Sequence, residues 1–166
     1  MAQIETSKKE SILSELENII KNIKTTNVAF IDENGTDVYY NNDVGYVDRQ
    51  FINITPNDIE TKANNWIIIN EKKHEWKALV GGEFENKLQV QILAYCQVNN
   101  IGENLSTLMN SLHKDIFTAI LKSKELNGKC DYIVPKTDYP ADNMIHPYGG
   151  YISNFEIVYT TQNLDY

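Results

Sequence analysis

The sequence predicts an α+β fold in which two principal amphipathic helices pack against a mixed, mostly antiparallel sheet. Two observations predict this class. Two long segments carry single apolar stripes at helical spacing, and several shorter segments alternate apolar and polar residues as strands do. The expected order of helix, hairpin, strands, helix and strand suits a sheet with helices packed on it. Because the chain has 166 residues, we expect residues 1–166 to form a single domain.

Two segments predict the helices. In residues 8–24, isoleucine and leucine recur at intervals of three and four, which places them on one side of a helix. Ser7 and Glu10 have the spacing of a capping box, in which each side chain binds the other residue's backbone N–H. A second stripe runs through residues 105–126, and Gly128 follows it as a natural stop.

Three segments predict a hairpin and two strands. Asn34 and Gly35 lie in the middle of residues 28–40, and this dipeptide favours a hairpin with a type I′ turn. Residues 65–70 are a short apolar run typical of a buried strand. Residues 151–162 place Tyr151, Phe155, Ile157 and Tyr159 on one face of a strand. We expect both segments to belong to the main sheet.

Two intervening segments show no clear period. Residues 41–65 are polar and rich in Asn and Asp, and we interpret them as a long loop or a short edge element. Residues 129–150 contain three prolines, and we interpret them as a loop. Loops of this length in a compact domain are usually functional or mobile.

A long strand is predicted for residues 87–97, and its two faces differ. One face is apolar and carries Leu88, Val90, Ile92, Ala94 and Cys96. The other face is rich in neutral amides and carries Lys87, Gln89, Gln91, Leu93, Tyr95 and Gln97. Amides at an interface form hydrogen bonds without the desolvation cost of a charge. We therefore treat Gln89, Gln91 and Gln97 as candidate contacts with a neighbouring chain, with plain solvent exposure as the alternative.

The charge argues against nucleic-acid binding as the main function. The chain has 15 Lys and Arg against 23 Asp and Glu, a formal net charge of −8, whereas a protein that binds duplex DNA needs a basic surface. Only two cysteines occur, and no apolar run has the length needed to span a membrane. We expect a soluble chain that is made in the cytosol, kept reduced and not bound to a membrane.

No pattern typical of a catalytic or metal site occurs. His74 lacks the second histidine of a metalloprotease helix. His113 lies beside an apolar stripe, and His146 has no nucleophile motif with it. The cysteines do not have the spacing of zinc ligands. We therefore expect no enzyme activity, no metal and no cofactor.

Tyrosine is abundant, with ten residues in the chain. Tyrosine suits protein interfaces because it offers a large contact area and a polar tip at low conformational cost. We name five tyrosines in or beside the expected loops as candidate subunit contacts, together with the three glutamines: Tyr39, Tyr40, Tyr46, Tyr139 and Tyr148.

The C-terminal segment DNMIHPYGGYISNFEIVYTTQ resembles the closing segment of tail terminator (tail completion) proteins of long-tailed bacteriophages. The preceding parts resemble the same family in order. ILSELENIIKNI matches its opening helix, WIIIN and KLQVQILAYC match its strands, and LSTLMNSLHKDIFTAIL matches its second helix. The resemblance covers residues 10–162 and is a pattern of elements rather than a catalytic signature.

This resemblance implies a ring, usually a hexamer, that caps the tail tube, stops its polymerisation and presents a surface to the head. The expected partners are further copies of the chain, the tail tube protein and the head completion or neck proteins. DNA would pass through the lumen without specific binding. The expected location is the tail or neck of the virion, after synthesis in the host cytoplasm.

Two alternatives stay open on the residues alone. One is a different head–tail adaptor or tube-cap component. The other is a small cytosolic ligand-binding domain or enzyme, with its pocket under residues 129–150.

Overall fold

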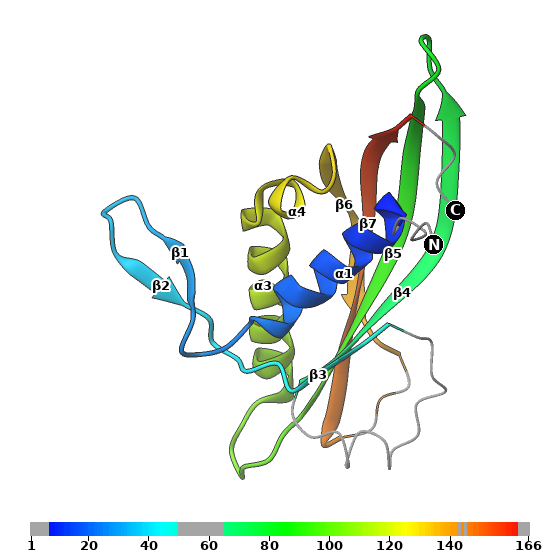
Figure 1. Cartoon of the computed structure of the whole chain (residues 1–166). Helices are drawn as coiled ribbons and strands as arrows, with labels where there is room; N and C mark the ends of the chain where they lie inside the picture. The colour runs from blue at the N-terminus through cyan, green and yellow to red at the C-terminus, as the bar shows by residue number, and fades with distance from the viewer. Residues whose placement is uncertain (1–6, 50–64, 143, 145, 163–166) are drawn as a thin grey trace, which may run out of the picture.

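Helices pack on a five-stranded sheet, and a separate two-stranded hairpin stands off from this body (Figure 1). The computed structural model describes residues 7–49, 65–142, 144 and 146–162. The arrangement confirms the α+β class. The elements are α1 (Lys8–Lys21), β1 (Val28–Ile31), β2 (Asp37–Tyr39), β3 (Tyr46–Asp48), β4 (Trp66–Ala78), β5 (Phe84–Gln97), α3 (Leu105–Lys122), α4 (Lys124–Gly128), β6 (Tyr132–Pro140) and β7 (Tyr148–Thr161).

The main sheet has the strand order β3-β4-β5-β7-β6. β3 pairs parallel with β4, and the other neighbouring strands of the described sheet pair antiparallel, so the sheet is mixed and mostly antiparallel as predicted. β5 is the middle strand. It pairs along its whole length with β7 on one side and from Phe84 to Tyr95 with β4 on the other.

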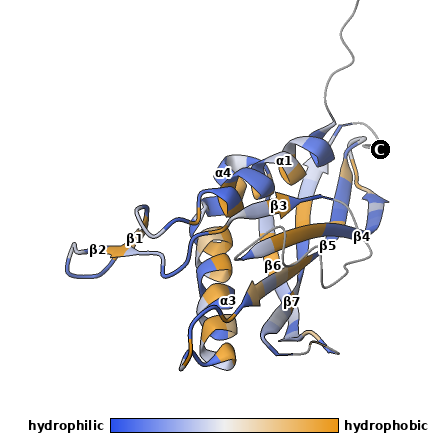
Figure 2. Cartoon of the chain, turned by 90° about the horizontal axis from the view of Figure 1, so that it is seen from below, coloured by the Kyte–Doolittle hydropathy of each residue, from blue (hydrophilic) through white to orange (hydrophobic). Residues whose placement is uncertain are grey.

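The main core lies between the sheet and the helices (Figure 2). The apolar face predicted for β5 is buried here, and β7 adds alternate residues such as Phe155 and Ile157. Amphipathic stripes of both long helices cover these strands, which buries a large apolar area and stabilises the fold. The helix residues in this core include Ile12, Leu16 and Ile20 of α1 and Leu112, Ile116 and Ile120 of α3.

A second apolar cluster occupies the other face of the sheet, near one end. Trp66 and Ile68 of β4 lie beside Leu93 and Tyr95 of β5, and all four are buried. Three partly buried residues pack against them: Met144, Tyr148 and Ile152. The second face of β5 is therefore apolar at this end and polar over the rest of its length, so the strand is amphipathic only in part.

Residues 129–150 are not a loop, so that prediction was wrong. β6 occupies Tyr132–Pro140 and pairs antiparallel with β7. Prolines are tolerated here because β6 is an edge strand, where a missing N–H need not break a ladder hydrogen bond. A bulge between Pro135 and Thr137 also shifts the register.

Several predicted boundaries differ from the structure. β4 continues to Ala78 instead of ending at residue 70, and β5 begins at Phe84 rather than at residue 87. Together they form a long hairpin, and the turn between them, residues 79–83, extends past the end of β7 (Figure 1). Its outer part is charged and mostly exposed, so it lacks the apolar alternation by which strands are recognised.

The segment 41–65 contains β3, a short edge strand, which confirms one of its two interpretations. Residues 50–64 of this segment lie outside the described residues. The hairpin predicted for residues 28–40 is present as β1 and β2, but its turn is not type I′. Only Gly35 of the two central residues has a positive φ, at 78°, whereas a type I′ turn needs both.

Both helices end earlier than predicted, α1 at Lys21 and α3 at Lys122. α4 then turns with the opposite hand, because Lys124, Glu125, Leu126 and Asn127 all have positive φ. This turn inserts Leu126 into the main core, where it is fully buried. Burial of this leucine offsets part of the steric cost of left-handed backbone.

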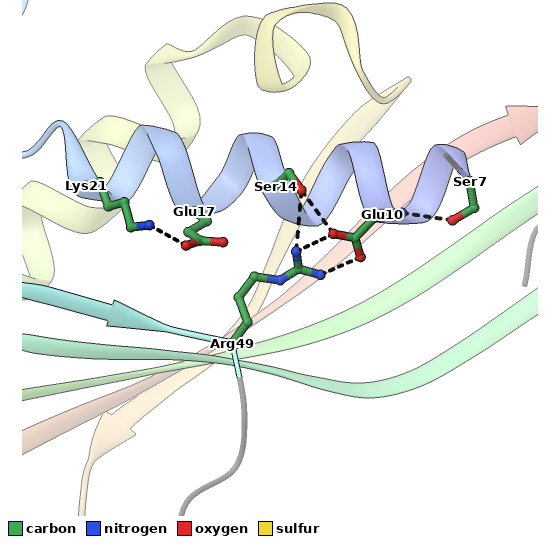
Figure 3. A network of polar contacts seen from close by, with 6 residues as sticks. All are labelled: Ser7, Glu10, Ser14, Glu17, Lys21 and Arg49. Atoms are coloured by element: carbon green, nitrogen blue, oxygen red, sulfur yellow. Dashed lines mark hydrogen bonds and ion pairs between the residues drawn. The ribbon is translucent and has the colours of Figure 1, made fainter. Parts of the chain in front are cut away.

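Only one of the two hydrogen bonds of the predicted capping box forms at the start of α1. The Ser7 hydroxyl accepts from the Glu10 N–H at 3.1 Å, but the Glu10 carboxylate faces Arg49 instead of the Ser7 backbone (Figure 3). The Arg49 guanidinium donates to both carboxylate oxygens, at 2.5 and 2.8 Å, and Ser14 adds a third donor at 3.1 Å. This fork ties the chain just after β3 to the first turn of α1.

We expect this contact to make stability depend on acid pH. The hydrogen bonds from Arg49 are the main cause that lowers the pKa of Glu10 from 4.5 to about 2. A depressed carboxyl pKa contributes stability that is present above pH 4.5 and lost as the pH falls from 4.5 to about 2. Because nearly half of the Glu10 side chain is exposed, the contribution is at most about 1 kcal/mol.

The measurement is urea unfolding of the wild type and of Glu10→Gln across this range. We expect the variant to be less stable at pH 7 and the difference to disappear toward pH 2. A difference that stays constant with pH would contradict the ion pair as its cause. Glu17→Gln on the same helix serves as the control, since Glu17 forms an exposed i,i+4 pair with Lys21.

In the part of the chain that the structure describes, no helix has both the length and the apolar character needed to cross a bilayer.

Candidate assembly surfaces

The candidate tyrosines are separated by the fold rather than gathered into one patch. Tyr39 is exposed on β2, whereas Tyr40 packs against the main core. Tyr46 and Tyr139 are exposed on β3 and β6, the two opposite edge strands of the sheet. Tyr148 is partly buried against the second apolar cluster. Of the five, Tyr39, Tyr46 and Tyr139 are therefore the ones available to a neighbouring chain.

The hairpin of β1 and β2, residues 28–39, forms an arm. In both overall views the arm and the main sheet lie on opposite sides of α3 (Figures 1 and 2). Three apolar or aromatic side chains are exposed on it: Val28, Ile31 (64 %) and Tyr39 (49 %). A two-stranded ribbon is marginal on its own, so exposed apolar residues on it favour a role in contact with another surface.

The tip of the arm is acidic. Asp32 holds the turn together, because its carboxylate accepts from the backbone N–H groups of Asn34 and Thr36 at 2.9 and 2.8 Å. Glu33 and Asp37 are exposed beside it. Residues 28–39 contain no Lys or Arg, so the arm carries three negative charges and no positive one.

The base of the arm is fixed by one buried carboxylate. Asp115 of α3 is 3 % exposed and accepts four hydrogen bonds from Asn41 and Asn42, which lie just beyond the arm. The backbone N–H groups of Asn41 and Asn42 donate to Oδ2 at 2.9 Å each, and their side-chain amides donate at 3.0 and 2.8 Å. The side-chain amide of Asn42 also donates to the Ser111 hydroxyl at 2.9 Å. The direction of the arm is therefore set by α3.

On the opposite side of the molecule, the amides of the sheet bind one another across strands. The Gln91 side chain of β5 donates to Asn154 Oδ1 of β7 at 3.2 Å, and Asn154 Nδ2 donates to Thr137 of β6 at 3.0 Å. Gln89 lies next to Glu156 in the register of the same two strands. The polar half of this face is thus an ordered row of hydrogen-bonding side chains.

This row borders a hollow of about 360 Å³ on the face of the sheet away from the helices. Its volume is near the lower end of the range for ligand sites, roughly 300–1,000 Å³. Six of the side chains that line it are polar or charged: Lys72, Gln89, Lys136, Thr137, Asn154 and Glu156. We call this surface the polar hollow.

Lysines surround the polar hollow although the whole chain is acidic. Lys136 pairs with Glu156 at 3.1 Å. Lys72, at the bulge in β4, forms no ion pair within the described residues. Two lysines against one glutamate leave the hollow positive. It therefore attracts carboxylates, and the row of amides supplies donors for them.

Gln97 does not belong to this row. It lines a different hollow of about 260 Å³ at the end of the sheet, beside Asn42, Asn65 and Asn99. The three glutamines predicted as one surface are therefore split into a pair, Gln89 and Gln91, and a distant third.

The projecting end of the β4–β5 hairpin carries further exposed apolar residues. Trp76 is packed edge-on against Phe84, with ring centroids 6.1 Å apart, yet about half of it stays exposed. Val80 at the turn is fully exposed. These residues were not among the predicted contacts, because the segment is short and mostly charged.

The histidines lie in different surroundings and do not meet. His74 Nε2 lies 3.2 Å from Asn86 Oδ1 and 3.1 Å from the Tyr159 hydroxyl. The His113 ring lies tilted against Tyr151, with ring centroids 4.1 Å apart, and its burial lowers its pKa below the usual value. His146 is exposed. Among the described residues, no group of three His, Cys, Asp or Glu side chains is placed to hold a metal ion.

Comparison of the chain with protein-family models and with curated proteins finds no match. The geometry of the arm and of the polar hollow is therefore what the chain itself offers for inferring a function.

The sequence predicts the amide face but not the residues that complete it. Lys136, Thr137 and Asn154 come from strands far from β5 in the sequence, and β6 was interpreted as a loop. The acidic turn of the arm was visible in the sequence as three carboxylates around Asn34 and Gly35. Its significance depends on the direction in which the arm points, which only the fold reveals.

Proposed function

We propose that this chain is a structural virion protein that assembles head to tail into a ring and caps the tail tube of a long-tailed bacteriophage. The ring, a hexamer in this proposal, stops growth of the tube and joins it to the head completion or neck proteins. The chain acts as a building block and not as an enzyme.

The observation that carries the proposal is the arm. It exposes apolar side chains on one side of α3, and an open polar sheet face lies on the other side. A ring is closed by heterologous contacts, in which one patch meets a different patch on the next copy. A molecule with a projecting element on one side and a receptive face on the opposite side is suited to such contacts.

The net charge of −8 fits the same proposal. An acidic ring repels the phosphate backbone, so DNA passes through the lumen without being retained. A basic lumen would bind the phosphates and release counterions, which would slow the passage of DNA.

The test is cryo-electron microscopy of virions made from the genome that encodes the chain. We expect one ring of copies at the junction between tube and head. When the gene is deleted, we expect tail tubes of uncontrolled length, because nothing stops their polymerisation. A chain that is absent from purified virions, or that lies in the capsid shell, would overturn the proposal.

A further inference from the structure

We propose that the acidic tip of the arm of one copy docks in the polar hollow of the next copy. The contact joins the Glu33 and Asp37 carboxylates to Lys72 and Lys136, with Gln89 supplying hydrogen bonds. This inference rests on the self-assembly in the proposed function and identifies the two surfaces that meet.

Charge complementarity is the first argument. The arm carries three carboxylates and no cation, and the polar hollow carries two lysines against one glutamate. Complementary charge raises the rate of association and fixes the orientation of the partners. The Lys72 ammonium forms no ion pair within the described residues, so it can bind a carboxylate without breaking an existing one.

The direction in which the arm points also favours docking on a second copy. The arm and the main sheet lie on opposite sides of α3, so the arm cannot fold back onto the hollow of its own chain (Figures 1 and 2). A second copy placed beyond the tip of the arm can present its open face. When this contact repeats around a closed ring, the arm of every copy is docked and the hollow of every copy is occupied.

The occupant of the hollow is therefore a turn of this same protein. The turn is preformed, because Asp32 already ties its backbone through two hydrogen bonds. A preformed turn loses little conformational freedom on docking, which favours affinity. Ile31 and Tyr39, on the strands next to the tip, add apolar contact area to the charged contact.

Disulfide trapping between purified copies tests the contact without requiring a phage tail. The double variant Asn34→Cys with Gln89→Cys places one thiol at the tip and one in the hollow. The native cysteines do not compete, because burial raises the pKa of Cys96 to about 11 and that of Cys130 to about 12. Thiols with such a pKa form little of the reactive thiolate.

We expect mild oxidation at the highest attainable concentration to link residue 34 of one copy to residue 89 of another, as identified by peptide mapping. The matched control is Asn34→Cys with Ile101→Cys, since Ile101 is fully exposed in the connection between β5 and α3 and does not line the hollow. If the 34–89 link is no more abundant than the 34–101 link, the inference is wrong.

Charge reversal then tests the cause. Reversing the tip with Glu33→Lys and Asp37→Lys, or the hollow with Lys72→Glu and Lys136→Glu, should lower the yield of the 34–89 link by about tenfold. Mixing the two reversed proteins should restore the link, because each arm then meets a hollow of opposite charge. Unchanged yields, or no restoration on mixing, would overturn the inference.

All four reversed residues are exposed, so circular dichroism should confirm that the variants stay folded. The outcomes also separate this inference from the proposed function. A 34–89 link together with absence from virions would reject the phage role alone. A ring in virions without the link would reject the docking of the arm alone.

Discussion

Replacing Asp115 by Ala is expected to destabilise the protein by about 3 kcal/mol, since it leaves four donors without their shared acceptor. For a domain of this size, that loss corresponds to a fall of roughly 6–12 °C in the melting temperature. Calorimetry and urea unfolding measure both quantities. The loss is large because Asp115 is buried, so water cannot easily replace the carboxylate.

Two matched variants show whether the hydrogen bonds are the cause. Lys114→Ala changes the exposed neighbour on the same helix and should shift stability by no more than about 0.5 kcal/mol. Asp115→Asn keeps one carbonyl acceptor, so its free energy of unfolding should lie between those of Asp115→Ala and Lys114→Ala. Limited proteolysis should also cleave Asp115→Ala faster within the arm. If Asp115→Ala is as stable as Lys114→Ala, Asp115 does not anchor the arm.

Replacing Trp66 by Ala is expected to have the largest effect on stability, a loss of about 3–5 kcal/mol. Trp66 is 2 % exposed, packs against Tyr95 with ring centroids 6.0 Å apart, and donates its indole N–H to Asp48 at 2.7 Å. Removing it leaves a cavity in the second apolar cluster and removes a bond between β4 and β3. Denaturant unfolding is the measurement.

The chain offers its own control, because its only other tryptophan, Trp76, is half exposed at the projecting hairpin. Trp76→Ala should cost less than about 1 kcal/mol. Trp66→Phe keeps much of the ring volume and removes the indole donor, so it separates packing from hydrogen bonding. If Trp66→Ala and Trp76→Ala lose similar amounts of stability, burial of Trp66 is not the reason for its large effect.

Periodicity predicted those elements whose burial is uniform along their length. α1, α3 and the apolar face of β5 were recognised because each has one buried side, and burial of that side determines the spacing of apolar residues. The outer half of β4 was missed because β3 pairs only with Trp66–Ile68, so this half is an exposed edge where charged residues are tolerated on both faces. Edge strand β6 was missed because its prolines are typical of loops.

The candidate surfaces were predicted only in part, because their partners come from distant positions. Gln91 reaches Asn154 over a sequence separation of 63 residues, and Asp115 reaches Asn41 over 74. Side chains this far apart meet only through strand order and helix packing, which local patterns do not contain. The tyrosines were selected by residue type and by their position in or beside expected loops, neither of which predicts where they lie in space, and the fold separates them.

The position of β5 in the middle of the sheet has a consequence for amide hydrogen exchange. From Phe84 to Tyr95, every residue of β5 has a partner on both sides, so the N–H groups of this part exchange with solvent only when the whole domain unfolds. The arm has two short strands and stands apart from the sheet, so its amides exchange through local opening at a far lower free energy. Deuterium uptake by the unmodified protein would therefore report docking of the arm directly, as slower exchange in residues 28–39 while the rate in β5 stays the same.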